Sequence, residues 1–190
     1  MKIGFALCGS FCTFSQVFPI MERMAENYTL IPILSQVTQT VDSRFGTAQS
    51  HIARIGQICG TSPICSIAQA EPIGPKKLLD ALIIAPCTGN TLSKLSHSIA
   101  DGPVTMAAKS HLRNGRPVII AISTNDALAG AAENIGRLLN KRNYYFVPFR
   151  QDDPLHKPSS IVADFSQLPD TLEAALQGRQ LQPLLLQQHT

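Results

Sequence analysis

Short runs of apolar residues recur along the chain, and the segments between them place apolar residues at a helical spacing. Four of these runs contain almost no polar residue: Ile3 to Cys8, Thr29 to Leu34, Ala81 to Ala85, and Pro117 to Ile122. Such runs predict strands that are buried on both faces, as in a parallel sheet covered by helices on each side. A fifth run, Tyr144 to Pro148, predicts one more strand.

The segments between the predicted strands favour helices. The first helical face is formed by Phe14, Val17, Phe18, Met21 and Met24, which recur at spacings of three and four. A second helix is expected to begin after Gly46 and to end at Gly60, a third covers residues 104–114, and Asn90 fits the N-cap of another. This alternation predicts an α/β fold with a mostly parallel central sheet and right-handed connections.

The alternation changes near residue 150. The sequence QDDPLHKPSS, residues 151–160, is rich in proline and charge and predicts a loop. A last helix follows, with Pro169 near its start and Gly178 just past its end, and then the extended tail LQPLLLQQHT. We therefore predict a single domain over residues 1–190, with a loop, a C-terminal helix and a tail from about residue 150.

The composition indicates which partners to expect. Only 15% of the residues are charged, against about 25% in a typical soluble domain, which favours self-association through neutral or apolar surface. The net charge is +3, and the basic pairs Lys76-Lys77 and Lys141-Arg142 are isolated along the chain, so no nucleic-acid-binding surface is predicted. No segment approaches the ~18 consecutive apolar residues of a membrane helix, and we expect a soluble protein that does not contact membranes.

The five cysteines contain no C-x-x-C pair: they are Cys8, Cys12, Cys59, Cys65 and Cys87. A chain of this length does not depend on disulfides for its core, and a zinc site needs four ligands at recognisable spacing. We predict buried reduced thiols of a cytosolic protein and no metal site.

Small and hydroxyl-bearing residues follow each of the first four predicted strands. These turns are Cys8-Gly9-Ser10, Ser35-Gln36-Val37-Thr38, PCTGNT after Ala85, and Ser123-Thr124-Asn125. One anionic cofactor at the carboxyl edge of a parallel sheet would explain all four, because small residues expose backbone N–H groups and helix N-termini attract anions. Ordinary helix capping is the alternative for each turn taken alone. Neither G-x-G-x-x-G nor G-x-x-x-x-G-K-[ST] is present, which favours a mononucleotide.

Three segments carry a resemblance to a known family: the first strand with its Gly9-Ser10 end, IIAPCTGNTLSKLSHSIAD, and RPVIIAISTND. They resemble the flavin-mononucleotide-binding family of cysteine decarboxylases, whose motifs are of the types P-A-S-A-N-T and P-A-M-N. The match is closer to a branch that supplies one subunit of a two-subunit synthase, and it covers nearly the whole chain. The resemblance implies a flavodoxin-like (Rossmann-like) three-layer fold, flavin mononucleotide (FMN) as the cofactor, and assembly into trimers or multiples of trimers.

The resemblance also assigns roles to residues of the turns. Gly9, Ser10 and Ser35 would hold the phosphate of FMN. The residues that would lie against the flavin are Pro86, Thr88, Gly89 and Asn90. Asn125 occupies the position of the asparagine in P-A-M-N, which implies a substrate contact.

The motifs also depart from the family. Cys87-Thr88-Gly89 replace Ala-Ser-Ala, and Ser123-Thr124 replace Ala-Met. The family decarboxylases carry a histidine on the segment that enters the IIAP strand, whereas this chain has Glu71-Pro72 there. We therefore do not expect oxidative decarboxylation of a peptidyl cysteine.

No catalytic residue can be assigned from the sequence. The five histidines are His51, His97, His111, His156 and His189. None has a paired acid at a characteristic spacing, so we expect each to be solvated or to cap a helix. His51 and His156 are kept as the alternatives that enter a site.

Arg44 is a candidate for binding the substrate. It lies in VDSRFG, the loop after the second predicted strand. A planar guanidinium can hold a carboxylate through two parallel hydrogen bonds, so we predict that Arg44 binds a dianionic substrate. A surface salt bridge is the alternative role.

Two functions fit these observations. The first, implied by the resemblance, is an oxidoreductase subunit that acts with a partner subunit. It would take a hydride equivalent from a dihydropyridine dicarboxylate to give pyridine-2,6-dicarboxylate, in the cytoplasm of the mother cell of a sporulating bacterium. The second is a non-enzymatic accessory protein that supports the partner and binds flavin only as a structural ligand, or not at all.

Overall fold

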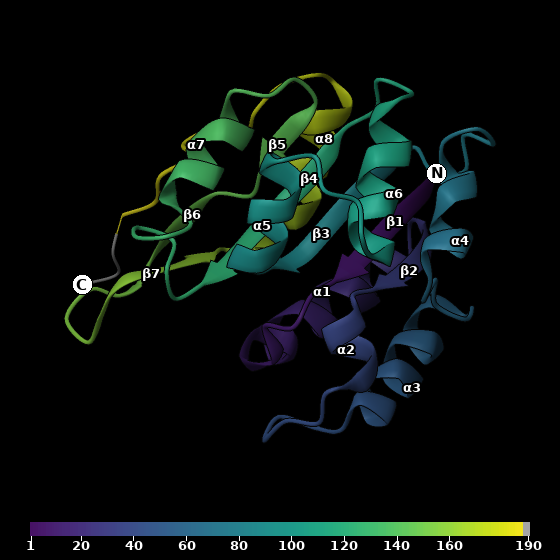
Figure 1. Ribbon diagram of the computed structural model, residues 1–190, viewed down its shortest axis with the longest axis horizontal. Helices are drawn as coiled ribbons and strands as arrows, with labels where there is room; N and C mark the ends of the chain where they lie inside the picture. The colour runs from purple at the N-terminus through teal and green to yellow at the C-terminus, as the bar shows by residue number, and fades with distance from the viewer. Residues whose placement is uncertain (188–190) are drawn as a thin grey trace.

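The predicted apolar runs form the centre of a seven-stranded sheet in the computed structural model, which describes residues 1–187 (Figure 1). The strands are β1 (Lys2–Leu7), β2 (Thr29–Leu34), β3 (Ala81–Cys87), β4 (Val118–Thr124), β5 (Tyr144–Phe146), β6 (Phe149–Asp153) and β7 (Lys157–Ala163). Their order is β2-β1-β3-β4-β7-β6, and β5 pairs with the beginning of β4. The five strands expected from the sequence are present and mutually parallel, which confirms the predicted α/β class.

The centre of the sheet is apolar on both faces. Every residue of β3 is buried, and Phe5 of β1 lies in register with Pro32 on one side and Ile83 on the other. Side chains of such a strand point to both faces of the sheet, and burying each large apolar one stabilises the fold by about 1.5–3 kcal/mol relative to leaving it in water. Both faces must therefore be covered. The helices of this chain provide that cover.

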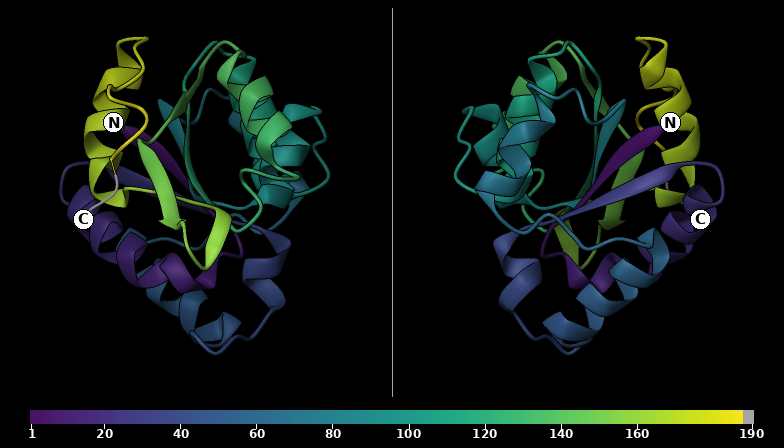
Figure 2. Two further views of the ribbon diagram at one scale, coloured as in Figure 1. Left: turned by 90° about the vertical axis from the view of Figure 1, so that its left-hand side faces the viewer. Right: turned by 90° about the vertical axis from the view of Figure 1, so that its right-hand side faces the viewer.

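Helices lie on both faces of the sheet (Figure 2). They are η1 (Phe11–Thr13), α1 (Phe14–Ala25), α2 (Gln36–Thr40), α3 (Ala48–Cys59), α4 (Ile67–Ala70), η2 (Glu71–Ile73), α5 (Gly89–Ser96), α6 (Pro103–Leu112), α7 (Ala132–Leu139), η3 (Phe165–Gln167) and α8 (Leu168–Leu176). Helices α1 and α8 cover one face, and α5, α6 and α7 cover the other. The long helices follow the predicted patterns; α7 and the short α2 and α4 were not predicted.

The prediction of a loop over residues 151–160 is wrong. These residues belong to a β-hairpin made of β6 and β7, which pair antiparallel. β7 continues the sheet through two residue pairs, Ser123 with Val162 and Thr124 with Ile161. The outer part of the hairpin is exposed and polar, so its sequence lacks the apolar run by which a buried strand is recognised. The C-terminal helix is where the sequence places it, while the end of the predicted tail, with His189, lies outside the described residues.

Two expectations about single side chains also need correction. Among the thiols, Cys8 and Cys87 are buried as predicted, but Cys12 is exposed; the five cysteines are all free. His51 and His111 are buried rather than solvated. No helix within residues 1–187 is both long enough and apolar enough to cross a membrane.

His111 is packed inside the protein in its neutral form. It lies on α6, is 0% exposed, and its Nε2 is 3.2 Å from the carbonyl oxygen of Pro117, so Nε2 carries the proton and donates it. Its Nδ1 is buried without a hydrogen-bond partner among the described residues. Burial lowers the pKa of His111 to about 4, and the bond to Pro117 offsets only part of that shift.

This buried histidine predicts a loss of stability in mild acid. In the unfolded chain a histidine has a pKa near ~6.5, so below that pH the unfolded state binds a proton that the folded state does not bind until pH approaches about 4. The free energy of unfolding should therefore fall by up to about 3 kcal/mol from pH 6.5 to pH 4 on this account. His111→Gln, measured by urea unfolding at several pH values, should flatten this slope. Ser15→Gln, at an exposed position of α1, changes no titratable group and should leave the slope unchanged.

Candidate functional site

The turns after the four central parallel strands meet at one edge of the sheet. The hydroxyl of Ser10, after β1, lies 2.7 Å from the hydroxyl of Ser123, near the end of β4. Thr91, after β3, donates to the sulfur of Cys8 over 3.3 Å. Thr38, after β2, donates to the carbonyl oxygen of Leu7 over 3.1 Å. Side-chain hydrogen bonds therefore hold the carboxyl ends of β1–β4 together, as the parallel arrangement requires.

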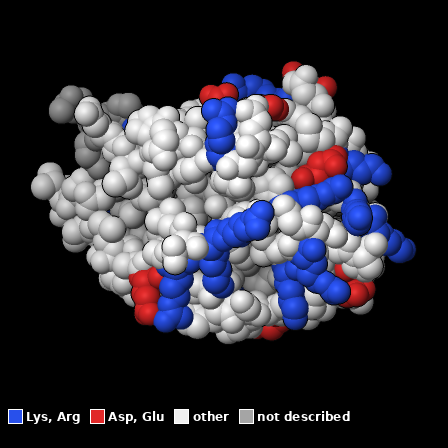
Figure 3. Space-filling view, turned by 90° about the horizontal axis from the view of Figure 1, so that it is seen from above, with Lys and Arg blue, Asp and Glu red and all other residues white. Residues whose placement is uncertain are grey.

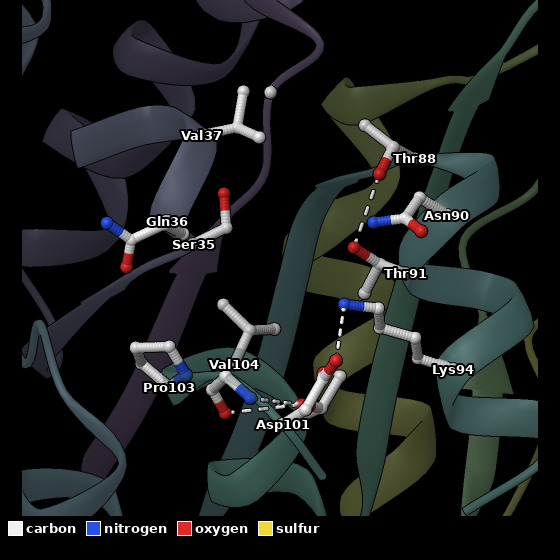
Figure 4. A pocket seen from close by; sticks show the side chains of 13 residues that line it. Ser35, Gln36, Val37, Thr88, Asn90, Thr91, Lys94, Asp101, Pro103 and Val104 are labelled. Atoms are coloured by element: carbon white, nitrogen blue, oxygen red, sulfur yellow. Dashed lines mark hydrogen bonds and ion pairs between the residues drawn. The ribbon is translucent and has the colours of Figure 1, made fainter. Parts of the chain in front are cut away.

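A first pocket of about 350 Å³ opens between these turns (Figure 4). Its lining consists of Gly9, Ser35, Gln36, Val37, Thr88, Asn90, Thr91, Lys94, Asp101, Gly102, Pro103, Val104 and Thr105. Figure 4 shows the residues of the β2–α2 turn on one wall and those of α5 on the opposite wall. Lys94 and Asp101 form an ion pair of 2.9 Å on the α5 side. Of the predicted cofactor residues, Gly9, Ser35, Thr88 and Asn90 share this pocket.

Two helix N-termini point toward the first pocket. Helix α5 begins after Thr88, whose hydroxyl lies 3.2 Å from that of Thr91 and does not cap the helix backbone. Helix α6 begins after Gly102, with Pro103 at its first position. The free N–H groups of a helix start carry a partial positive charge, so two such starts on one pocket favour an anion. The N-cap of α5 is Thr88 and not Asn90, which lies inside the helix, so the predicted cap was wrong by two residues.

Gly9 packs closely against Val37 of α2. A Cβ atom at this position would lie 2.5 Å from Cγ1 of Val37, closer than two carbon atoms can approach. A side chain here would push the α2 turn outward or fill the space beside it. Gly9 and Thr88 line the first pocket and also the second, so the two pockets adjoin.

The second pocket, of about 520 Å³, lies between the ends of β1, β3 and β4 and the hairpin. It is lined by Gly9, Ser10, Cys12, Thr13, Gln16, Arg44, Thr88, Ser123, Thr124, Asn125, Asp152, Lys157, Ser160, Ile161 and Val162. The structure thus places both predicted substrate residues, Arg44 and Asn125, on one pocket with Ser10. Asn125 accepts a hydrogen bond of 3.3 Å from Ser160, which is buried at the base of the hairpin.

Arg44 makes no ion pair with any residue in the described part of the chain. Its guanidinium carbon lies 4.8 Å from the ring centre of Phe45, so the planar group stacks on its neighbour. The alternative of a surface salt bridge is therefore not formed, and the guanidinium edge is free to bind an anion. The other cation of this pocket, Lys157, pairs with Asp152 over 2.9 Å.

Two of the predicted flavin residues lie outside both linings. Pro86 is buried within β3. Gly89 begins α5, where a Cβ atom would lie 2.7 Å from the carboxylate of Asp126 and 2.9 Å from the hydroxyl of Thr124. The turn after β4 therefore packs directly on this glycine, which gives it a role in packing as well as any role toward a ligand.

The sequence prediction missed several lining residues. Lys157 and Ser160 were assigned to a loop, and nothing in the polar sequence of residues 151–160 indicates that they face a pocket. The helix over residues 104–114 was predicted, but its start at Gly102-Pro103 was not expected to line the pocket.

The two buried thiols at the strand ends are not activated as nucleophiles. Burial raises the pKa of Cys8 to about 11, and it raises the pKa of Cys87 well above the usual value, so both thiols stay protonated. Glu71 lies in η2 on the segment that enters β3 and lines neither pocket. His156 was expected to lack an acidic partner, but it pairs with Asp153 over 2.9 Å at the hairpin.

His51 lies in a separate aromatic pocket of about 330 Å³ beside α1 and α3. Its ring is 5.6 Å from Phe11 in a stacked arrangement and 4.9 Å from Phe14 at an edge, measured between ring centres. Burial, and secondarily the charge of Arg54, lowers the pKa of His51, so its ring is neutral near pH 7. It does not line either of the two pockets at the strand ends, so the alternative that His51 enters the site is not supported by its position.

Known proteins resemble this chain in sequence and in fold over nearly its whole length. The chain is 45% identical over 189 residues to the B subunit of dipicolinate synthase of Bacillus subtilis (strain 168), a match that covers 99% of this chain and 94% of the relative. The crystal structure of the dipicolinate synthase B subunit from Bacillus halodurans C has 46% identity and a TM-score of 0.90, and covers 99% of this chain and 97% of that one.

A more distant structure, the FMN-dependent cysteine decarboxylase SpaF, has 18% identity and a TM-score of 0.67, and covers 94% of this chain and 97% of that one. At this identity the similarity shows the fold alone. It confirms the expected flavodoxin-like arrangement. The family model named Flavoprotein matches residues 1–166, and the chain therefore belongs to the Flavoprotein family.

Proposed function

We propose that this chain is the flavin-binding B subunit of a dipicolinate synthase, which acts with the A subunit of that enzyme to convert dihydrodipicolinate to dipicolinate. The observation that carries the proposal is the identity with a dipicolinate synthase B subunit over nearly the whole chain, combined with two adjoining pockets at the strand ends. We further propose that the protein works in the cytoplasm of the mother cell of a sporulating bacterium.

The pockets fit FMN in size and chemistry. Small-molecule pockets span about 300–1,000 Å³, and the two adjoining pockets fall in this range. Gly9 lines both pockets, so its backbone is available to a ligand, and a Cβ atom there would collide with Val37. In this proposal the phosphate lies at Gly9, where the two pockets adjoin, with Ser35 on the side of the first pocket and Ser10 on the side of the second. The N-termini of α5 and α6 supply partial positive charge from the first pocket.

The remaining residues of the β3–α5 turn would contact the flavin ring. Thr88 is the best placed, because it lines both pockets and its hydroxyl, among the described residues, bonds to one other group, the hydroxyl of Thr91. Asn90 is exposed on the wall of the first pocket. Pro86, which is buried in β3, and Gly89, which packs against the turn after β4, would fix the backbone of this turn.

The second pocket would hold the substrate. Arg44 offers an unpaired guanidinium. The side-chain amide of Asn125 accepts a hydrogen bond from Ser160 through its oxygen, and its NH₂ group can donate to the substrate. These groups suit two carboxylates on one ring: a bidentate contact at Arg44 and a hydrogen bond at Asn125. Held in this way, a dihydropyridine ring would have a fixed orientation toward the boundary with the first pocket, which lowers the entropic cost of the reaction.

Aromatisation of dihydrodipicolinate removes two electrons and two protons from its ring. Flavin, when bound, supplies a two-electron acceptor for a hydride equivalent. The residues of this chain would bind and orient the substrate and exclude water. This oxidation does not require a side-chain nucleophile, which agrees with the protonated state of Cys8 and Cys87.

We also propose that the chain assembles with itself, as trimers or multiples of trimers. Several large apolar side chains are exposed, among them Phe45 and Val37 beside the pockets and Leu128 after β4. Together with the low content of charge, they provide apolar surface that a neighbouring copy could bury. Sedimentation that detects only monomer would contradict this part of the proposal.

The phosphate assignment predicts the effect of one charge. Ser10→Asp places a carboxylate where the phosphate is expected, so FMN affinity should fall by about 10-fold to 100-fold, the effect of roughly 1–3 kcal/mol of repulsion. Flavin absorbance and fluorescence measure the affinity. Ser15→Asp, an exposed position of α1 that lines neither pocket at the strand ends, is the matched control and should bind FMN as the parent does. Unchanged affinity of Ser10→Asp, or equal parental affinity for riboflavin and FMN, would contradict the assignment.

The substrate assignment predicts a graded effect at Arg44. Arg44→Lys keeps the charge but loses the planar fork, so dipicolinate formation by the two reconstituted subunits should fall about 10-fold, and Arg44→Ala should reduce it further. Arg54→Ala is the control, because Arg54 also stacks on a phenylalanine, at 4.7 Å from the ring of Phe18, but lines neither of these pockets. If both Arg44 variants match the parent, Arg44 is a surface or interface residue.

The same assay separates the redox role from an accessory role. The reconstituted subunits should form dipicolinate only when this chain carries flavin. If the flavin-free pair reaches the parental rate, the chain is an accessory protein that supports its partner, and the proposed redox role is wrong.

A further inference from the structure

Basic residues that are isolated along the sequence are gathered at the amino edge of the sheet, opposite the two pockets. Each basic pair precedes a parallel strand: Lys76 and Lys77 come before β3, Arg113 and Arg116 before β4, and Lys141 and Arg142 before β5. Parallel strands begin at the same edge, so these segments lie together. With Lys109, one helical turn before Arg113 on α6, they form what we call the basic face. Figure 3 shows this end of the molecule, with Lys and Arg side chains gathered across it.

Hydrogen bonds join the segments into one surface. Arg116 donates to the carbonyl oxygens of Lys77 and Leu79. The side-chain amide of Asn114 donates to the carbonyl oxygen of Gly74 over 3.0 Å, and Lys141 donates to that of Ser96, at the end of α5, over 2.7 Å. The backbone N–H of Val118 donates to the carbonyl oxygen of Asn143 over 2.8 Å and joins the two groups, so the basic face is continuous from the segment before β3 to the end of α5.

Most of the charge on the basic face is not balanced. Arg116 pairs with Asp80 over 3.4 Å, and Lys141 donates to carbonyl oxygens. No described residue forms an ion pair with the other five cations, which are Lys76, Lys77, Lys109, Arg113 and Arg142, and all five are exposed. Asp80, already paired, and Glu71 lie on the segment before β3, and Glu26 lies in the turn before β2 at the same edge. A patch of this kind attracts anions and repels a second copy of itself.

An apolar groove of about 410 Å³ lies within the basic face. Its lining is Leu95, Ser98, Ile99, Thr105, Lys109, Leu112, Arg113 and Tyr144. Ile99 is 46% exposed, a large fraction for an isoleucine. Tyr144 has no hydrogen-bond partner among the described residues, and burial raises its pKa to about 12, so its hydroxyl remains a donor. The groove thus combines an apolar floor, the hydroxyls of Ser98, Thr105 and Tyr144, and two unpaired cations at its rim.

We propose that this groove is a docking site for an acidic segment of another protein, which inserts an apolar side chain between α5 and α6. A small carboxylate in the groove would reach only Lys109 and Arg113, whereas the unpaired cations extend to Lys76, Lys77 and Arg142. Nucleic acid fits less well, because Tyr144 is the single aromatic ring in the lining and is itself half-buried. The identity of the partner rests on the proposed function: the acidic segment belongs to the A subunit of the synthase.

The groove extends from the amino edge toward the first pocket, which opens at the carboxyl edge. Thr105 lines both the groove and the first pocket. Helix α6 therefore touches the docking site at its end and the proposed cofactor site at its start, and a docked segment would hold this helix in place.

The test measures binding of the purified A subunit to this chain by calorimetry. Lys109→Glu combined with Arg113→Glu should weaken binding at least about 10-fold, and parental binding should weaken as salt rises from about 50 to 300 mM. Ile99→Ala should weaken binding about 5-fold to 10-fold without changing the dependence on salt, because it shortens the apolar floor and removes no charge. Arg23→Glu combined with Arg179→Glu changes the net charge equally, at exposed positions outside the basic face, and should bind as the parent does. FMN titration of each variant confirms that it is folded.

The possible results separate this inference from the proposed function. If the parent binds the A subunit and the Lys109/Arg113 variant binds it equally well, the docking site is wrong and the proposed function stands. If the parent does not bind the A subunit at all, the proposed partnership fails, and this occupant of the groove fails with it. Salt-sensitive binding of a short DNA duplex that the double variant loses would assign the face to nucleic acid. Self-association that the double variant loses would assign it to a second copy, and either result overturns the proposal.

Discussion

The two faces of the parallel sheet must both be kept from water, and the rest of the structure follows from this requirement. β3 has no exposed residue, so it can neither bind a ligand along its length nor tolerate a charge there. Helices must therefore cover both faces, and each crossover must bring the chain back to the same edge to begin the next strand. Polar chemistry is left with the two ends of the strands. One end carries hydroxyls, glycines and helix starts, and the other carries lysines and arginines.

The carboxyl edge is built mainly from backbone turns and from side chains that hydrogen-bond to one another. Ser10 with Ser123, and Thr91 with Cys8, tie neighbouring turns together before any ligand is considered. Such contacts fix the turns in position, which is the preorganisation that a cofactor pocket needs. The groups that remain available are the helix starts of α5 and α6 and the guanidinium of Arg44. They suit the binding and orientation of anions better than proton transfer or covalent catalysis.

The sequence predicted the parts of the fold whose signal is periodic. Helix α1 and strand β2 are examples, because apolar residues at a helical spacing, or in an unbroken run, report burial directly. The hairpin was missed because its outer residues are polar and its pairing with β4 is short. Burial of His51 and His111 was also missed, because the position of one histidine in the sequence does not show whether its side chain is buried. The convergence of four turns followed from the parallel fold, and the structure places Gly9, Ser10, Ser35, Thr88, Asn90, Arg44 and Asn125 around the two pockets. The contributions of Lys157, Ser160 and the start of α6 depend on tertiary contacts that the sequence does not display.

The length of the strands separates the two ends of the molecule. The seven residues of β3, at about 3.3 Å each, span roughly 23 Å, while charges in physiological salt are screened over about 8 Å. A change of charge at Lys76 or Arg142 therefore leaves the electrostatic potential around Ser10 nearly unaltered. In their electrostatic effect, charge substitutions at one end are therefore close to independent of those at the other, and helix α6 is the element that connects the two ends. A fold of this kind can change its associations and its chemistry in separate evolutionary steps.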